Sequence, residues 1–233
     1  MTSAGPLVSS LPPPPPGHKL IIEGQAAMPF NEAENAVFYN KVQVFNRDLS
    51  IHVIKYFSEL RAREAAEAAL KKSRKQAKLP FTEADTAELD ATDWSSKVAA
   101  TAAEDGIVIL DALAASALRS IRYVKEIPGV KKVVANDLDA AAVEKAHANI
   151  LYNQVDTSKM EVVQGDATAL MYGSRGADAQ FDVIDLDPYG SAAPFIDAAV
   201  QSVKSGGLLL VTCTDMAVSQ SVACVHEMNI ATN

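Results

Sequence analysis

The sequence is poor in several features that would point to particular classes of protein. It holds only two cysteines, Cys213 and Cys224, which cannot form a four-ligand zinc site on their own, so we expect no metal. No stretch of 18 apolar residues occurs, and we therefore expect no membrane-spanning helix. The G-x-G-x-x-G loop is also missing, which argues against a pyrophosphate-binding turn. Such low cysteine usage favours a reducing compartment. We expect a soluble, intracellular protein.

The net negative charge of the chain argues against wholesale wrapping by nucleic acid. The formal net charge is −8, but the charges are unevenly placed. Residues 61–78 are mostly basic and residues 83–105 mostly acidic. We interpret residues 61–97 as a charged, solvated insertion whose two halves attract each other. A phosphate-binding role for the basic half is the alternative.

The first 60 residues divide into a tail and a folded segment. Residues 1–17 include five consecutive prolines and are expected to form a disordered, proline-rich tail. We expect residues 18–60 to form an N-terminal segment that contacts substrate and cofactor. Within it, residues 18–24 and 36–45 read as extended pieces, and an apolar stripe predicts a helix over 49–70 capped by Asp48.

Residues 98–218 show a repeating pattern of strands and helices. Apolar runs predict five strands, at 107–110, 132–137, 160–163, 181–186 and 206–213. Helical stretches fall between them at about 116–127, 140–152 and 192–203. The alternation indicates an α/β, Rossmann-like fold, with a mainly parallel sheet and helices on both faces.

The fourth of these strands ends in an unusual turn, Asp187-Pro188-Tyr189-Gly190. Open α/β sheets bind their ligands at the carboxyl ends of the strands. A short acid beside a flat ring on a rigid turn suits an enzyme that holds a planar amine and accepts its hydrogen bonds. The alternative is a turn whose Asp187 merely caps the next helix.

Three further acids follow the first three strands and point to a nucleoside cofactor. Asp111 opens a loop of small residues, where a backbone can approach a ligand closely. Asp137 is placed to accept both hydroxyls of a ribose, and Asp166 with the Ala167 amide to hold an adenine edge. An adenosine without a diphosphate indicates S-adenosylmethionine rather than NAD. Taken singly, each acid is equally compatible with a helix cap or a loop.

Several blocks of the chain resemble the tRNA (guanine-26) N2-dimethyltransferases, a family of class I S-adenosylmethionine-dependent methyltransferases. The resemblance covers most of residues 20–217 outside the charged insertion. Its blocks are Ile22–Gly24, Val37–Asn40, Val44–Asp48, Leu110–Tyr123, Val134–Asp139, Asp185–Ser191 and Val211–Met216.

The resemblance implies a set of site residues. The residues implied to line the S-adenosylmethionine pocket are Arg47, Arg119, Asp137, Asp166 and Ala167. It further implies that Asp187 is the catalytic acid and that Phe38 and Tyr189 sandwich the target base. The alternatives are that both aromatics belong to the core and that Arg47 pairs with the turn at Asp48.

The chemistry of guanine agrees with these roles. The N2 lone pair of guanine is delocalised into the ring and is a poor nucleophile. Hydrogen bonds from N2 to the Asp187 carboxylate and the Pro188 carbonyl would localise it for attack on the methyl group. The implied partner is tRNA, methylated once and then a second time.

Two departures from the family pattern affect what we expect of this chain. Ala117 stands where the family has glycine, and its methyl group is expected to crowd the cofactor. Residues 219–233 form a divergent tail, so we expect the last strands of the sheet and a C-terminal domain to be missing, and an exposed edge after the fifth strand.

Three rival functions therefore stay open. One is a truncated remnant that binds cofactor weakly, and another is an amino-methyltransferase with a different substrate. A nicotinamide dehydrogenase is the weakest rival because the glycine loop is missing. The family occurs in the nucleus and in mitochondria, and the basic block Lys71–Lys75 resembles a nuclear signal.

Overall fold

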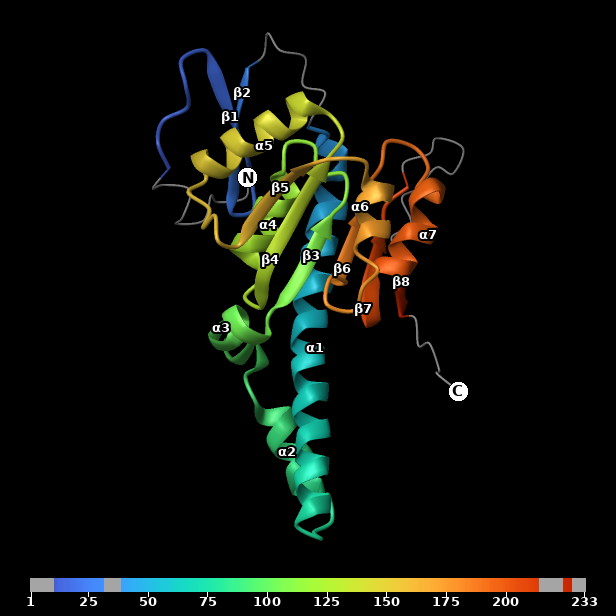
Figure 1. Ribbon diagram of the computed structural model, residues 1–233. Helices are drawn as coiled ribbons and strands as arrows, with labels where there is room; N and C mark the ends of the chain where they lie inside the picture. Colours follow the sequence, from blue (N-terminus) through green and yellow to red (C-terminus); the bar gives the residue numbers. More distant parts are fainter. Residues whose placement is uncertain (1–10, 32–38, 214–223, 228–233) are drawn as a thin grey trace.

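The core of the protein is a twisted six-stranded sheet (Figure 1). The computed structural model describes residues 11–31 and 39–213, and the backbone of 224–227. The strand order is β5-β4-β3-β6-β7-β8, in which the first five are parallel and β8 is antiparallel to β7. The strands are β3 (Ile107–Asp111), β4 (Val130–Asp137), β5 (Met160–Gln164), β6 (Phe181–Leu186), β7 (Val203–Val211) and β8 (Cys224–Glu227).

The five parallel strands confirm the fold expected from the sequence, whereas β8 was not expected. All six residues of β6 are buried, as befits a central strand covered on both faces. The expectation of an exposed edge after the fifth strand is wrong, because β8 pairs with β7 from Leu208 to Val211. This added strand comes from the segment that we interpreted as a divergent tail.

Two hydrophobic layers cover the sheet, because successive side chains of each strand point to opposite faces. On one face, Ile107 and Ile109 of β3 join a cluster with residues of α1 (Val44–Gln76), α4 (Leu118–Glu126) and α5 (Ala140–Tyr152). On the other face, Leu110 joins residues of α6 (Ala167–Gly173) and α7 (Ala193–Ser202). Helices on both faces fulfil the expectation for a parallel α/β sheet.

An N-terminal hairpin packs on the first of these layers. Its strands are β1 (His18–Glu23) and β2 (Ala26–Asn31), which pair antiparallel. Asn153, just after α5, holds the hairpin through its side-chain amide. Its Oδ1 accepts from the Ala27 amide at 2.8 Å, and its Nδ2 donates to the Ala27 carbonyl at 2.6 Å. The predicted extended piece at 18–24 is thus confirmed.

The helix that follows begins earlier and ends later than the sequence suggested. The expectation of an extended piece at 36–45 is wrong for residues 41–45, because a 3-10 helix at Lys41–Gln43 leads directly into α1. Residues 36–38 of that piece lie outside the described residues. The prediction that Asp48 caps a helix is wrong: Asp48 lies within α1, and its carboxylate pairs with Arg122 at 2.7 Å. The alanine- and lysine-rich sequence after residue 61 continues the helix because these residues have high helix propensity.

The charged insertion forms a helical arm that projects beyond the sheet (Figure 1). The end of α1 is accompanied by α2 (Glu83–Ala91), and α3 (Trp94–Asp105) returns the chain to the core. Arg63 bonds Asp90 at 2.6 Å and Arg74 pairs with Asp85, which confirms that the basic and acidic halves attract each other. The expected boundary at residue 97 falls inside α3.

Of the proline-rich tail, residues 11–17 are described. The Tyr152 hydroxyl donates to the Pro12 carbonyl at 2.6 Å, so this part of the tail lies against α5. Within the described residues, no helix has the length and apolar character needed to cross a membrane.

Candidate active site

A cavity of about 490 Å³ opens at the carboxyl ends of β3, β4 and β6. The strand order reverses between β3 and β6, and ligands of open α/β sheets bind at such a point. Seven of the residues singled out from the sequence line this cavity: Arg47, Asp111, Arg119, Asp137, Asp187, Pro188 and Tyr189.

Small residues shape the floor of the cavity in the loop after β3. Ala115 adopts a left-handed conformation with φ of 47°, and its amide donates to Asp137 Oδ2 at 2.8 Å. The other oxygen of Asp137 accepts from the Asp139 amide at 2.9 Å. These two bonds fix the Asp137 carboxylate between the ends of β3 and β4, at the mouth of the cavity.

Arg119 of α4 connects the carboxylates beneath the site. Its guanidinium donates to Asp185 Oδ2 at 2.8 Å and to Asp187 Oδ2 at 2.5 Å. It also donates to the Ser50 hydroxyl at 3.0 Å, and the Tyr123 hydroxyl donates to Asp185. Because Arg119 and Asp185 are buried, this chain of bonds fixes the position of Asp187.

The same surroundings change the proton affinity of two acids. Burial raises the pKa of Asp187, the positive charge of Arg119 opposes that shift, and the negative charge of Asp185 adds to it. Burial also raises the pKa of Asp111 to about 7, with a further contribution from Asp185. Asp111 receives a hydrogen bond from the Ser120 hydroxyl at 2.6 Å. A carboxylate of raised pKa is a better proton acceptor than an ordinary one.

Arg47 reaches the cavity from the first turn of α1 and is held from behind by Glu23. Two bonds of 2.6 Å join the guanidinium of Arg47 to the carboxylate of Glu23, which also binds Arg122 at 2.7 Å. Arg47 further donates to the Asn40 carbonyl at 3.1 Å. Its partner is therefore Glu23 of the hairpin and not the turn at Asp48.

The structure places the remaining predicted residues away from the cavity or outside its description. Asp166 caps α6 by accepting from the Ala169 amide at 2.8 Å, and Ala167 is buried under that helix. Neither is among the described residues that line the cavity. Phe38 lies outside the described residues. Tyr189, in contrast, lines the cavity and stands at its rim with 79% of its surface exposed.

Ala117 does not project into the cavity as expected. It is fully buried in a cluster with Ala114, Ala135 and Ala146, and its φ of 59° is left-handed. A left-handed φ favours glycine, so the strain at Ala117 lies in its own backbone and not in a contact with the cavity.

Sequence reasoning missed the residues that hold the site together from behind. Glu23 contacts Arg47, Ser50 and Asp185 contact Arg119, and Tyr123 donates to Asp185, but none of these four lines the cavity. The available signal was a charged residue inside an apolar strand, since Glu23 ends β1 and Asp185 lies within β6. Buried charges of this kind require a partner.

Comparison with known proteins identifies the family. The model of the N2,N2-dimethylguanosine tRNA methyltransferases matches residues 17–226. The chain belongs to this family. The tRNA (guanine(26)-N(2))-dimethyltransferase of Schizosaccharomyces pombe is 45% identical over 206 residues, which cover 85% of this chain and 37% of that protein. The mouse enzyme of the same name is 47% identical over 216 residues, covering 88% and 32%.

A solved structure extends the likeness of the family to three dimensions. The complex of Trm1 from Pyrococcus horikoshii with S-adenosyl-L-methionine has a TM-score of 0.55 and 26% identity, covering 84% of this chain and 43% of that one. A methyltransferase from Streptococcus mutans, at 13% identity and a TM-score of 0.55, shares the fold. The chain spans about a third of the length of the curated N2,N2-dimethylguanosine methyltransferases that it matches.

Proposed function

We propose that this chain transfers methyl groups from S-adenosylmethionine to N2 of guanine-26 in tRNA, first one and then a second. The observation that carries the proposal is the Asp187 carboxylate, which Arg119 holds at the end of β6 inside the cavity. Membership of the family and the names of the relatives point to the same reaction.

The side chains of the cavity fit S-adenosylmethionine chemically. Asp137 offers carboxylate oxygens that suit ribose hydroxyls, while Arg47 and Arg119 offer guanidinium groups that suit the carboxylate of an amino acid. The small side chains of Ala114 and Ala115 leave room for a ligand near the backbone. We retain Asp166 and the Ala167 amide as proposed contacts of the adenine. When bound, the cofactor supplies a methyl group on a positively charged sulfur.

The proposed step uses Asp187 to prepare the amine. Its carboxylate accepts a hydrogen bond from guanine N2, and the Pro188 carbonyl accepts a second, which concentrates the lone pair on nitrogen. Nitrogen then forms a bond to the methyl carbon while the carbon–sulfur bond breaks and its electron pair stays on sulfur. Asp187 takes the proton that nitrogen loses and releases it to water.

The target base has to leave the tRNA stack to reach Asp187. Tyr189 at the rim is proposed to stack on it, and Phe38 is proposed as the opposite face. Each such stack contributes roughly 1–3 kcal/mol.

The partner and compartment belong to the same proposal. We infer that tRNA is the partner, and that the protein works in the nucleus or in mitochondria. One yeast relative is named as mitochondrial, at 42% identity. The described residues hold no group of three or more His, Cys, Asp or Glu side chains suited to a metal ion.

A methyl-transfer assay tests the proposal. The chain is incubated with S-adenosylmethionine labelled in its methyl group and with a tRNA transcript carrying guanine or adenine at position 26. We expect label in the guanine-26 transcript alone and a loss of about 10²–10⁴-fold for Asp187→Asn.

Each rival function gives a different result. Equal labelling of both transcripts would favour an amino-methyltransferase of another specificity. Cofactor binding without any transfer would favour a remnant.

A further inference from the structure

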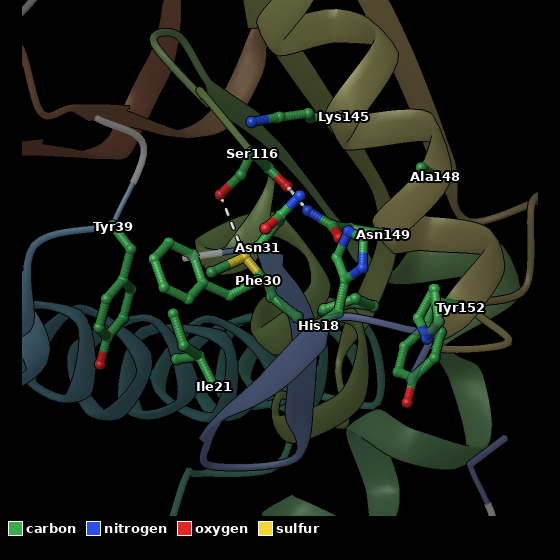
Figure 2. A pocket seen from close by; sticks show the side chains of 13 residues that line it. His18, Ile21, Phe30, Asn31, Tyr39, Ser116, Lys145, Ala148, Asn149 and Tyr152 are labelled. Carbon is green, nitrogen blue, oxygen red and sulfur yellow. Dashed lines mark hydrogen bonds between the residues drawn. The ribbon is translucent and has the colours of Figure 1, made fainter. Parts of the chain in front are cut away.

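A second cavity, of about 270 Å³, lies beside the first, between the N-terminal hairpin and α5 (Figure 2). Its walls include the aromatic rings of Phe30, Tyr39 and Tyr152 and the apolar side chains of Ile21 and Met28. Neither the expected roles of the sequence motifs nor the proposed reaction uses this cavity.

The two cavities share a wall. Ser116, in the loop after β3, lines both of them. Tyr39 lines the second cavity, and its ring centre lies 5.4 Å from the guanidinium carbon of Arg47, which lines the first. A ligand made of linked units can therefore extend from the first cavity into the second.

The polar groups of the shared wall already have partners. The Ser116 hydroxyl bonds the sulfur of Met28 at 3.2 Å, and the Ser116 carbonyl accepts from the Asn149 side chain at 3.0 Å (Figure 2). The Tyr152 hydroxyl donates to the Pro12 carbonyl, so this residue offers the cavity its ring and not its hydroxyl. The interior thus offers flat apolar faces more than hydrogen bonds, which suits an aromatic ring as occupant.

Positive charge and polar edges lie around this apolar interior. Lys145 of α5 lines the cavity beside Ser116, and Asn31 and His18 line it as well (Figure 2). Flat rings with a nearby cation and an amide are the means by which proteins bind single-stranded nucleotides: the base stacks, its edge meets the amide, and the phosphate meets the cation.

We propose that this second cavity binds a nucleobase of the RNA substrate adjacent to the target guanine, with Lys145 near its phosphate. The proposal rests on the proposed function, because it takes the ligand to be RNA. The base stacks against Phe30, Tyr39 and Tyr152, and this contact holds the RNA in place while the target base is at Asp187.

A filled-cavity variant tests the proposal with a short RNA. The probe is a fluorescein-labelled, single-stranded heptamer with guanine in the middle, and its dissociation constant is measured by fluorescence anisotropy. Ala148→Leu adds a side chain at an exposed residue of α5 that lines the cavity. The matched control is the same substitution at Ala103, an exposed residue of α3.

We expect Ala148→Leu to weaken binding about 10-fold, and Ala103→Leu to leave it within twofold of the wild type. Removing the base next to guanine, on one side or the other, should weaken RNA binding by the wild type by a similar factor. The same removal should not weaken binding by Ala148→Leu any further. Tyr152→Phe should bind like the wild type and Tyr152→Ala should not, since only the ring is required.

Three results would overturn the proposal. The first is that Ala148→Leu binds the RNA as tightly as the wild type. The second is that the losses of affinity from Ala148→Leu and from the abasic RNA multiply when the two are combined. The third is that the wild-type chain binds S-adenosylmethionine but no RNA. Failure of the proposed function would give a different result. If RNA binding depends on the second cavity but the chain does not bind S-adenosylmethionine, the proposed methyl transfer is refuted and the proposed base-binding site is not. Circular dichroism verifies that each variant is folded.

Discussion

At the scale of single residues, the site concentrates negative charge beneath one guanidinium. Asp111, Asp185 and Asp187 all influence one another, and Arg119 is the cation that opposes their mutual repulsion. The fully buried Asp185 has one oxygen, Oδ1, without a hydrogen-bond partner among the described residues. The pKa values of Asp111 and Asp187 are both raised, which suits a site that receives a proton.

The first prediction concerns Asp111 and the dependence of stability on pH. Its pKa is raised to about 7 in the folded protein, against about 3.9 in an unfolded chain. Between these values the folded state holds a proton that the unfolded state has lost, so this group makes stability fall as pH rises from about 4 to 7. In Asp111→Asn, the free energy of unfolding should fall by about 2–4 kcal/mol less between pH 4 and pH 7 than in the wild type. Urea unfolding across this pH range measures the difference.

Asp178→Asn is the control for this prediction, because Asp178 is exposed. The same pH dependence in Asp111→Asn and in the wild type would contradict the assigned role of burial.

A second prediction concerns the two left-handed alanines of the first loop. Ala115 has φ of 47° and is half-buried, whereas Ala117 has φ of 59° and is fully buried. Ala115→Gly should stabilise the protein by about 0.5 kcal/mol, because relief of the strained backbone exceeds the entropy that glycine adds to the unfolded chain.

Ala117→Gly gains the same relief but loses a buried methyl group, a cost of about 0.8 kcal/mol, so it should be neutral or mildly destabilising. Midpoints of urea unfolding compare the two variants. A more stable Ala117→Gly than Ala115→Gly would show that the buried methyl is itself strained.

At the scale of elements, a buried ion cluster joins the hairpin to two helices. Glu23 at the end of β1 bonds Arg47 of α1 and Arg122 of α4, and Arg122 also pairs with Glu126 and Asp48. Glycine at position 24 leaves room for Glu126 and Arg122, since a Cβ there would lie 2.2 Å from Glu126 Oε1. The cluster therefore determines where the hairpin sits and where Arg47 meets the cavity.

The third prediction tests this cluster with a matched pair of variants. Glu23→Gln removes one carboxylate from between two buried guanidinium groups and should cost about 3–5 kcal/mol of unfolding free energy. Glu161→Gln makes the same change in the exposed pair with Lys132 and should cost less than about 1 kcal/mol. Equal losses would mean that the buried cluster adds no stability beyond that of a surface pair.

The sequence predicted regular elements well where local signals are strong. The bounds of α5 and β6 agree with those expected, since Asp139 caps α5 and β6 is a mostly apolar run that ends at the Asp187-Pro188 turn. The short α6 was missed because seven residues carry little periodic signal. The start of α1 was misplaced because Asp48, a residue favoured at caps, pairs instead with Arg122, a residue far along the chain.

The site followed the same division between local and distant signals. The acids at the ends of β3, β4 and β6 were found from strand positions alone, and they line one cavity. The pairs Glu23–Arg47 and Arg119–Asp187 were not predicted. Their members are far apart in the sequence and meet only in the folded protein. Asp166 was also chosen from its position at a strand end, but in the structure it caps α6. Its contact with the cofactor stays a proposal.

At the scale of the whole molecule, the cavity lies where the separate parts of the fold meet. The ends of β3, β4 and β6, the start of α4 and the first turn of α1 all contribute to it. A ligand in the cavity would contact every one of these elements at once. Cofactor binding should therefore be coupled to the stability of the entire sheet and of the helix that the hairpin holds in place.

The last prediction measures that coupling. S-adenosylmethionine at 100 times its dissociation constant should stabilise the folded chain by about 2.7 kcal/mol, which raises Tm by roughly 5–10 °C for a protein of this size. Asp137→Ala should abolish the rise, while Asp178→Ala, a control at an exposed site, should keep it. Because Asp137 also accepts the Ala115 and Asp139 amides, its variant will melt lower without ligand, so the difference in Tm with and without cofactor is the quantity compared. An equal rise in Asp137→Ala would place the cofactor away from the end of β4, and no rise in the wild type would remove the cavity as its binding site.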